Sequence, residues 1–412
     1  MLFRIVVFAV AALAWGQTAA PPSEVFPLAH SESPQAAEEL AITLRTVGRF
    51  QPSAVLVSQN SLSVSGTADQ LALARWLIGE LDQPTTAPLP ANSAERQYLP
   101  QDGTGEVVCV LYLAHSENPR DFNEVMTAIR AVNDVRQMYP YFARKAIGMR
   151  GTPAQTQLAV WAAGELDTPA TAPRTPHSTG HQYQVQDGSA EMVGLTYLAH
   201  SGTPGNLNQV MILIRTMTDI RRVFPVQSRS AMSWRGTVDQ IRLVEWLVRE
   251  LDQPADAPLP PNTVEHQNFV NDGSLDVVRL FHLAQARTPR DVNEAMTLIR
   301  SVTDMRRAFP YQGRKVLGFR GTAQQIQMAA WLVNALALPP GSGPQLMTAG
   351  NEQVGVFFLP PDQTSEELQA LFGAVRRATQ AGQSFFTEAR KAIAIRGTAD
   401  QIAIAKRMIE QP

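Results

Sequence analysis

The sequence repeats itself at a fixed interval of 85 residues. A leucine–alanine pair begins at Leu28 and recurs at Leu113, Leu198 and Leu283. The same interval separates four tryptophans and four Gly-Thr pairs, which are Trp76, Trp161, Trp246 and Trp331, and Gly66-Thr67, Gly151-Thr152, Gly236-Thr237 and Gly321-Thr322. A fifth unit follows at 76 residues, with Leu359 and Gly397-Thr398. Because a fixed period indicates one structural unit copied in tandem, the function is expected to belong to a repeated surface or to the whole array.

The 412-residue chain is therefore expected to form five small domains. A repeat core of about 60 residues can just bury a hydrophobic core of its own. We place the repeats at residues 24–84, 96–169, 181–254, 266–339 and 352–412. The linkers between them are rich in proline and alanine, which favours extended and semi-rigid spacing.

The first 20 residues read as a secretory signal peptide. Arg4 precedes an apolar run over residues 5–15, and small and polar residues follow as far as Ala20. The alternative is an uncleaved anchor helix. No later segment reaches 18 uninterrupted apolar residues, so we expect no membrane-spanning segment after cleavage. The protein is expected to be exported, to the periplasm or the cell envelope.

Charge and cysteine content exclude two further classes. The formal net charge is −2, so the basic surface that binds nucleic acid through its phosphates is not expected. Cys109 is the only cysteine, so an exported chain of this kind has no internal disulfide. The repeat-equivalent residues are Gly194 and Arg279, which favours an ordinary strand position for Cys109 over a nucleophile.

Two helices are predicted in every repeat. The first begins at a capping residue followed by proline in units one to four, at Ser33-Pro34, Asn118-Pro119, Thr203-Pro204 and Thr288-Pro289. In unit five, Thr364 and Glu367 form a capping box instead. The second helix begins at a Thr-x-x-Gln capping box in all five units, and a Leu-Asp-Gln-Pro sequence or a close variant ends it in most of them.

A strand pair precedes the second helix, and its second member alternates in the period of a β-strand. One side is apolar, whereas the other carries only small residues and a single valine, including Gly148, Ser233, Gly318 and Ala394. A solvated sheet face would carry Thr, Lys, Glu and Arg instead. We therefore predict that this face meets a partner: the extra hairpin of units two to four, a second copy of the chain or a secretion component. The alternative is a central strand covered by long side chains of its own repeat.

The predicted unit is strand, helix, strand, strand, helix, and the fold class is α+β. Units two to four carry Asp-Gly pairs ahead of the first strand, at Asp102-Gly103, Asp187-Gly188 and Asp272-Gly273. Such pairs suit tight hairpins, so we expect one extra edge strand in each of these units.

This order of elements resembles a known family. The strand-to-helix junction over residues 60–67, Asn-Ser-Leu-Ser-Val-Ser-Gly-Thr, and the Leu-Asp-Gln-Pro ending are similar to the small, KH-like periplasmic N-domains of secretins. Secretins are the outer-membrane channels of type II and type III secretion and type IV pilus systems. Units two to five depart from the pattern, with pairs such as Lys145-Ala146 in place of Asn-Ser. The resemblance implies a helix pair on a small sheet, with ring assembly or partner docking as its role and no catalysis. The long barrel region that follows these domains in secretins is not found here, so the chain is not expected to be the pore.

Catalytic and metal-binding patterns are not found. His30, His115 and His200 occur once per repeat, about 85 residues apart, whereas a zinc site needs several ligands that converge. We find no carboxylate pair, phosphate loop or nucleophile motif, so we expect no enzyme, no cofactor and no metal. The arginines that precede Gly-Thr, at Arg150, Arg235, Arg320 and Arg396, are expected to be solvated or ion-paired. Binding of an anion or a partner is their alternative.

The four tryptophans are the other candidate interaction residues. Trp246 lies outside the buried stripe of its helix, and the position holds Arg407 in the last unit. We predict that Trp76, Trp161, Trp246 and Trp331 contact the neighbouring repeat; packing on their own linker prolines is the alternative. Two functions stand: a non-enzymatic envelope scaffold that binds copies of itself or secretion components, or an exported array that binds cell-wall glycan or another polymer.

Overall fold

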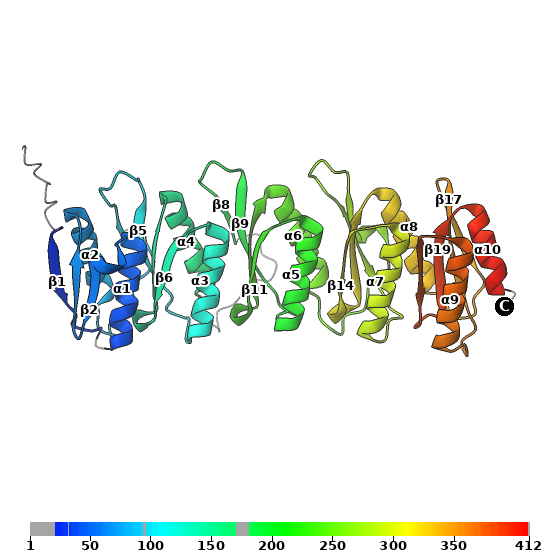
Figure 1. Ribbon diagram of the computed structural model, residues 1–412, viewed down its shortest axis with the longest axis horizontal. Coiled ribbons are helices and arrows are strands. Elements are labelled where there is room, and N and C mark those ends of the chain that lie inside the picture. The colour runs from blue at the N-terminus through cyan, green and yellow to red at the C-terminus, as the bar shows by residue number, and fades with distance from the viewer. Residues whose placement is uncertain (1–20, 32, 94–95, 170–180, 411–412) are drawn as a thin grey trace, which may run out of the picture. The chain divides into compact units, whose positions relative to one another are not determined.

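The computed structural model describes residues 21–31, 33–93, 96–169 and 181–410, so the predicted signal peptide lies outside the described residues. Within them the chain is α+β, with five small antiparallel sheets and ten α-helices (Figure 1). The order strand, helix, strand, strand, helix recurs in every repeat, as the sequence predicts. The domain boundaries given above remain a prediction.

The elements are as follows. The first repeat contains β1 (Ser23–Pro27), α1 (Pro34–Gly48), β2 (Val55–Ser58), β3 (Ser61–Ser65) and α2 (Ala68–Leu81). The second contains β4 (Gln97–Tyr98), β5 (Val107–Tyr112), α3 (Pro119–Asn133), β6 (Gln137–Tyr141), β7 (Ala146–Gly151) and α4 (Pro153–Leu166). The third contains β8 (Gln182–Gln184), β9 (Glu191–Tyr197), α5 (Pro204–Thr218), β10 (Arg222–Val226), β11 (Ala231–Thr237) and α6 (Val238–Leu251). The fourth contains β12 (Gln267–Phe269), β13 (Val277–His282), α7 (Pro289–Thr303), β14 (Arg307–Tyr311), β15 (Val316–Gly321) and α8 (Ala323–Leu336). The fifth contains β16 (Gln345–Ala349), β17 (Glu352–Phe358), α9 (Ser365–Thr379), β18 (Gln383–Thr387), β19 (Ala392–Gly397) and α10 (Ala399–Glu410).

The strand that ends in Gly-Thr is an inner strand of every sheet. The strand orders are β1-β3-β2, β4-β5-β7-β6, β8-β9-β11-β10, β12-β13-β15-β14 and β16-β17-β19-β18. In the fourth sheet, for example, Val277 of β13 lies opposite Gly321 of β15, and Phe309 of β14 lies opposite Gly318. The small residues predicted on one side of this strand therefore sit in the middle of each sheet.

The extra edge strands of units two to four are present as β4, β8 and β12, but the fifth sheet also has one. Strand β16 pairs with β17 through a turn at Gly350, whose φ is +64°. The strand β16 was not expected, because this turn lacks the Asp-Gly pair of repeats two to four. Glycine at a positive φ suits the turn equally well.

Cap contacts confirm the predicted helix starts apart from that of α4, which begins at Pro153, directly after Thr152. Ser33, Asn118 and Thr203 accept backbone N–H bonds at the first turns of their helices, with proline at the start of each helix. Thr288 and Thr364 form capping boxes. The Thr-Gln box opens α2, α6 and α8, and Thr398 and Gln401 make both of its bonds at α10.

The capping glutamine also ties the two helices of a repeat together. The side-chain amides of Gln240, Gln325 and Gln401 donate to the carbonyl oxygens of Thr218, Thr303 and Thr379, at 3.0, 3.1 and 2.9 Å. Each of these carbonyls belongs to the last residue of the first helix of its repeat. One glutamine therefore caps the start of the second helix and donates a hydrogen bond to the last carbonyl oxygen of the first helix.

The chain divides into two compact units. The first contains residues 1–91, 95–112 and 137–152, which include the first repeat and the sheet of the second. The second contains residues 92–94, 113–136 and 153–412, which include the helices of the second repeat and all later repeats.

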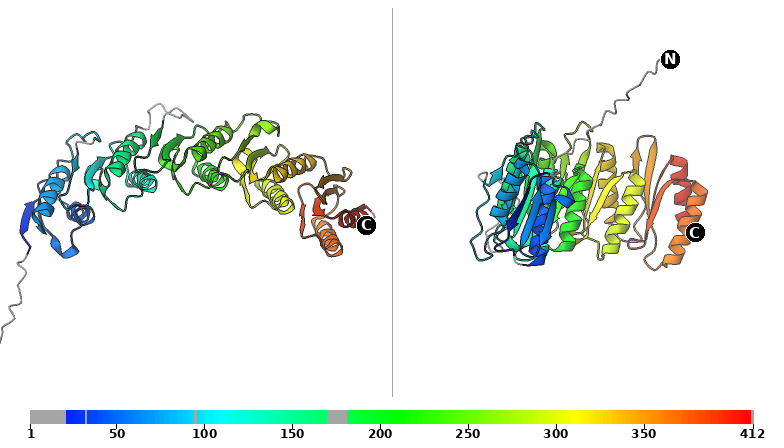
Figure 2. Two further views of the ribbon diagram at one scale, coloured as in Figure 1. Left: turned by 90° about the horizontal axis from the view of Figure 1, so that it is seen from above. Right: turned by 60° about the vertical axis from the view of Figure 1, so that its left-hand side comes forward.

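Each unit contains a hydrophobic core that passes from one repeat to the next. In the first of these two compact parts of the chain, Val108 and Val110 of β5 join the core of the first repeat. In the second compact part, Val278 and Leu280 of β13 join the core of the third repeat. Val277 and Phe281 of the same strand belong to the core of the fourth repeat. Alternate residues of β13 thus point to helices of different repeats, so both faces of this sheet are buried. In Figure 2 (left), the yellow helices of the fourth repeat lie beside the sheet of the fifth.

Candidate functional site: the joint between repeats

The repeated surface is an interface that we call the joint: the helix pair of one repeat packed on the sheet of the next. Helix α1 lies along β6, α3 along β10, α5 along β14 and α7 along β18. The first of these joints lies within the first of the two compact parts of the chain, and the other three lie within the second. Each joint is built from the same positions of the repeat, so its chemistry occurs four times in the described residues.

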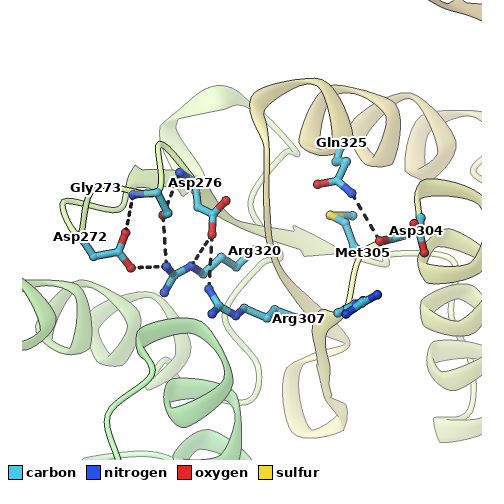
Figure 3. A pocket seen from close by; sticks show the side chains of 10 residues that line it. Asp272, Gly273, Asp276, Asp304, Met305, Arg307, Arg320 and Gln325 are labelled. Carbon is cyan, nitrogen blue, oxygen red and sulfur yellow. Dashed lines mark hydrogen bonds and ion pairs between the residues drawn. The ribbon is translucent and has the colours of Figure 1, made fainter.

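A buried arginine of the inner strand forms the centre of the joint. In the joint between repeats three and four, the guanidinium of Arg320 bonds to Asp272 and, at 3.0 Å, to Asp276 (Figure 3). Its Nη1 donates to the carbonyl oxygen of Met217, near the end of α5, at 2.9 Å, and lies 3.3 Å from a carboxylate oxygen of Asp219. The Arg320 side chain is only 1% exposed, so the charge is neutralised by carboxylates of its own hairpin while it binds the preceding helix.

The other three joints contain the same arginine. Arg150, Arg235 and Arg396 donate Nη1 to the carbonyl oxygens of Val47, Val132 and Val302, at 3.5, 3.3 and 3.5 Å. Their Nε atoms bond to Glu106, Glu191 and Glu352 at 2.8, 2.7 and 2.7 Å. Of the two roles considered for these arginines, the structure therefore gives the ion-paired one.

The aspartates in the hairpin turns, Asp102, Asp187 and Asp272, have lowered pKa values and so carry a negative charge beside the buried arginine. Hydrogen bonds from Ser274 and the charge of Arg320 lower the pKa of Asp272 to about 2, against a smaller effect of burial. The pKa of Asp187 is lowered to about 2 in the same way by Ser189 and Arg235. The pKa of Asp102 is also lowered to about 2, first by Arg150 and then by Thr104. An open groove of about 590 Å³ lies beside Arg320 and is lined by Asp272, Asp304, Arg307 and Gln325 among others (Figure 3).

A second arginine follows the outer strand of each receiving sheet and reaches the end of the preceding repeat. Arg144 donates to the carbonyl oxygens of Pro84 and Ala87, at 2.5 and 3.0 Å. Arg229 donates to Leu166 and His115, Arg314 to Pro254 and Ala257, and Arg390 to Ala337 and Leu338. The acceptors are all backbone carbonyl oxygens, and the several N–H donors of one guanidinium can bind two of them at once.

An acidic or amide residue on the first helix completes the contact from the other side. Glu39, Glu124 and Gln209 accept the backbone N–H groups of Phe142, Ser228 and Gln312, at 3.0, 2.9 and 2.8 Å. Glu294 accepts those of Glu388 and Ala389, at 3.0 and 3.2 Å. These bonds satisfy backbone groups that follow the end of a sheet strand.

Two joints carry a further lock made of a serine, a tyrosine and an aspartate. The Tyr141 hydroxyl lies 2.6 Å from Oγ of Ser31, which donates to Asp82 at 2.8 Å. The pKa of Asp82 is raised by burial but lowered overall by bonds from Ala29, His30 and Ser31. In the joint between repeats three and four, Ser201 bonds to Tyr311 at 2.8 Å, and the Ser201 N–H donates to Asp252 at 2.7 Å.

The predicted partner face lies inside the joint. A Cβ atom on Gly148 would lie 2.5 Å from Cγ2 of Thr43 on α1, and one on Gly318 would lie 3.2 Å from Leu213 on α5. Ser233 is fully buried, and Ala394 lies in the core shared with the fourth repeat. The neighbour of Gly148 and Gly318 is the preceding repeat of the same chain, which neither sequence alternative named.

The four tryptophans are all half-buried. The Trp76 ring lies 5.7 Å from the ring of Tyr98 on β4, and the Trp161 ring lies 5.4 Å from the ring of Tyr183 on β8. Both tyrosines belong to the extra edge strand of the following repeat. Trp246 and Trp331 pack on cores that include residues of the following sheet, such as Val278 and Val354.

The histidines and the cysteine hold structural positions. The backbone N–H groups of His30, His115 and His200 donate to Asp82, Asp167 and Asp252. Among the described residues, no group of three or more His, Cys, Asp or Glu side chains is placed to hold a metal ion. Burial raises the pKa of Cys109 to about 12. No helix in the described part of the chain is both long and apolar enough to cross a bilayer.

Sequence reasoning missed the second arginine and the acceptor on the first helix. Arg144, Arg229, Arg314 and Arg390 follow the repeat interval, as do Glu39, Glu124, Gln209 and Glu294. Their period was the available signal. It did not indicate a joint, because a solvated helix face or turn carries the same residue types.

Comparison with known proteins adds little to this geometry. No family model and no curated protein matches the chain. A solved structure that is similar to it is Aeromonas hydrophila ExeD, with 12% sequence identity and a TM-score of 0.14, over 57% of this chain and 41% of the ExeD chain. The matched region thus spans less than half of that structure. A TM-score this low establishes no shared role.

Proposed function

We propose that this protein is a non-enzymatic assembly module of the cell envelope, built from secretin N-domain-like repeats and acting with protein partners. The partners are copies of the chain or components of a secretion or pilus channel. The sequence resemblance to secretin N-domains supports the class of partner. Nucleic acid is not among the partners, since the net charge is −2.

The observation that carries the proposal is the use of the repeated polar residues. In the joint between repeats three and four, Arg320, Arg314 and Gln209 are all engaged with the neighbouring repeat. Residues that recur in every unit thus hold one α/β layer on the next. A helix pair that binds the sheet of another domain is the type of contact from which larger assemblies are built.

Export and partner binding are tested together in the native host. The full-length chain is tagged at its C-terminus, cross-linked in living cells and purified from the periplasmic and envelope fractions. We expect recovery there together with a secretion or pilus component. An Arg320→Met variant, which removes the centre of one joint, should reduce that recovery. The exposed Arg242→Ala variant, whose side chain is 74% exposed, should not.

Two results contradict the proposal. Retention of the chain in the cytoplasm would exclude an envelope role. Binding of the purified chain to isolated cell-wall polymer, without any secretion or pilus component among the cross-linked proteins, would favour the alternative of an exported polymer-binding array.

A further inference from the structure

The joint between repeats four and five contains a cavity of about 420 Å³. Its walls are the turn before α7, the helix α8 and the end of β18, with Leu283, Val333 and Leu336 as apolar lining. These three side chains are 7%, 4% and 5% exposed, so the apolar wall is buried in the protein. A volume of this size falls within the range of small-molecule sites, about 300–1,000 Å³.

The preceding joint contains protein groups at the same place. There, Ser201, Tyr311 and Asp252 form the lock described above, and Tyr311 is 1% exposed. The repeat-equivalent residues in the last joint are Ala286, Thr387 and Ala337. Ala286 and Thr387 both line the cavity. The last joint therefore lacks one hydroxyl, one phenol ring and one carboxylate at a site where the preceding joint has all three.

The remaining charges at the cavity favour an anion. Arg390 donates Nη2 to the backbone of Ala337 and Leu338, and its buried Nε, like that of the repeat-equivalent Arg144, has no hydrogen-bond partner. Burial, and then the nearby charge of Arg287, lowers the pKa of Arg390. The carboxylate of Asp291 is engaged by the N–H groups of Arg287 and Thr288 and by the Thr288 hydroxyl. A carboxylate in the cavity would give the Nε atom of Arg390 an acceptor. It would also offset the positive charges of Arg390 and Arg287, which lie near each other.

We infer that this cavity binds a small aromatic carboxylic acid, whose ring occupies the place of the missing tyrosine and whose carboxylate replaces the missing aspartate near Arg390. The cavity lies in the last joint, where alanine, alanine and threonine replace the serine, aspartate and tyrosine of the lock. It therefore adds a ligand-binding role to one interface of the chain, at a place that Tyr141 and Tyr311 occupy in the first and third joints and that Val226 takes in the second.

The test uses the full-length protein and the probe 4-hydroxyphenylacetate, followed by ligand-observed NMR and calorimetric titration. We expect saturable binding with a Kd of about 1 mM or below, as suits a ligand of this size. The neutral amide of the same probe should bind at least about tenfold more weakly, because it does not supply the charge that Arg390 requires.

Three variants act as controls: two place larger side chains in the cavity of the last joint, and one removes the tyrosine ring from the preceding joint. The triple variant A286S/A337D/T387Y installs the lock of the preceding joint, and T387Y alone fills the ring position; each should lower the affinity at least about tenfold. Tyr311→Thr removes the ring from the preceding joint but leaves Asp252, so it should create no second site for an anion. Absence of binding up to about 10 mM, equal binding by a folded filled variant, or equal binding of acid and amide would overturn the inference.

Discussion

At the scale of single residues, the buried arginine is the side chain on which each joint depends. Arg320 is bonded to two carboxylates of its hairpin and to a helix carbonyl of the preceding repeat. We predict that Arg320→Met lowers the free energy of unfolding by about 1–3 kcal/mol, because it removes the charge partner of Asp272 and Asp276 and leaves the Met217 carbonyl oxygen in the joint without its donor. Chemical denaturation of the full chain measures the change.

An exposed ion pair provides the matched control. Arg242 lies 3.5 Å from Asp239 on α6, and its side chain is 74% exposed. Arg242→Ala should change stability by less than about 1 kcal/mol. Equal effects of the two substitutions would mean that the joint does not depend on its buried arginine.

A pH dependence is predicted at His282. Burial, and then the charges of His266 and Arg314, lowers the pKa of His282 from its ordinary value of 6.5 to about 4. The unfolded chain then binds more protons than the folded chain between these pH values, so stability falls as the pH drops from about 6.5 to about 4. The loss is on the order of 3 kcal/mol at the acid end, at 1.36 kcal/mol per pKa unit.

The repeat itself suggests the substitution that removes this dependence. The equivalent residues Tyr112 and Tyr197 donate their hydroxyls to the carbonyl oxygens of Glu80 and Glu165, at 3.0 and 2.6 Å. His282→Tyr should make the same bond to Glu250 and reduce the difference in thermal unfolding midpoint between pH 7 and pH 5. An unchanged difference would assign the pH dependence to another group.

At the scale of secondary-structure elements, helix and strand match each other in size at the joint. Leu213 of α5 faces Gly318, and Thr43 of α1 faces Gly148. In the joint between repeats two and three, the corresponding residues are Ala128 and Ser233, so a smaller helix residue accompanies a larger strand residue. The last joint departs from this exchange, because Leu298 accompanies Ala394 there. Close packing limits the volume that each gap admits.

A double-mutant cycle tests the match. Gly318→Ala should cost about 1–3 kcal/mol, because its Cβ would lie 3.2 Å from the Leu213 side chain. Leu213→Ala should cost about 2–5 kcal/mol. The two losses should add to more than the loss of the double variant, by at least about 0.5 kcal/mol. Gly205→Ala on α5, with no atom within 4 Å of its Cβ position, is the control and should not be destabilising.

Elements could be predicted from the sequence, but their stacking could not. The cap at Thr203 and the box at Thr237 are local signals, and both helices begin where those residues indicate. The small face at Gly318 indicated close approach of another surface. It did not indicate which surface, because strand periodicity assigns a residue to a face without naming the neighbour on it. The joint is formed by residues about 100 positions apart, such as Met217 and Arg320, and no local pattern records such a contact.

At the scale of the whole molecule, charges at the joints distinguish one repeat boundary from another. The residue after the first helix is Arg49, Asp134, Asp219, Asp304 or Gln380, each at a positive φ. Asp134 pairs with Arg222 at 2.7 Å, and Asp219 pairs with Arg307 at 2.9 Å. In the first joint, Arg49 instead donates to Gln137 and pairs at 2.7 Å with Glu106, the carboxylate that also binds Arg150. We interpret these differences as a means of matching each helix pair to its own sheet, since like charges at a wrong boundary would repel.

A charge reversal tests this interpretation. Asp219→Arg places a cation beside Arg307 and Arg320 and should lower stability by up to about 1 kcal/mol, since Asp219 and Arg307 are both partly exposed. Adding Arg307→Gln, which copies the residue pair of the first joint, should recover part of the loss in thermal unfolding measurements. A double variant that is less stable than Asp219→Arg would contradict the interpretation.

Stability along such an array is a sum of repeat and joint contributions, so the weakest joint opens first. The joint before the fifth repeat has Ala286, Ala337 and Thr387 where its predecessor has the serine, aspartate and tyrosine lock, and it encloses the cavity of about 420 Å³. We predict that backbone amides of β17 and β19 exchange hydrogen about tenfold or more faster than those of β13 and β15, which corresponds to about 1.4 kcal/mol of local stability. Mass-spectrometric hydrogen exchange on the full chain measures this difference.

The A286S/A337D/T387Y variant should reduce the difference in exchange rate while leaving exchange in β13 and β15 unchanged. Equal protection of the two sheets in the wild-type protein would show that the lock contributes little to the joint.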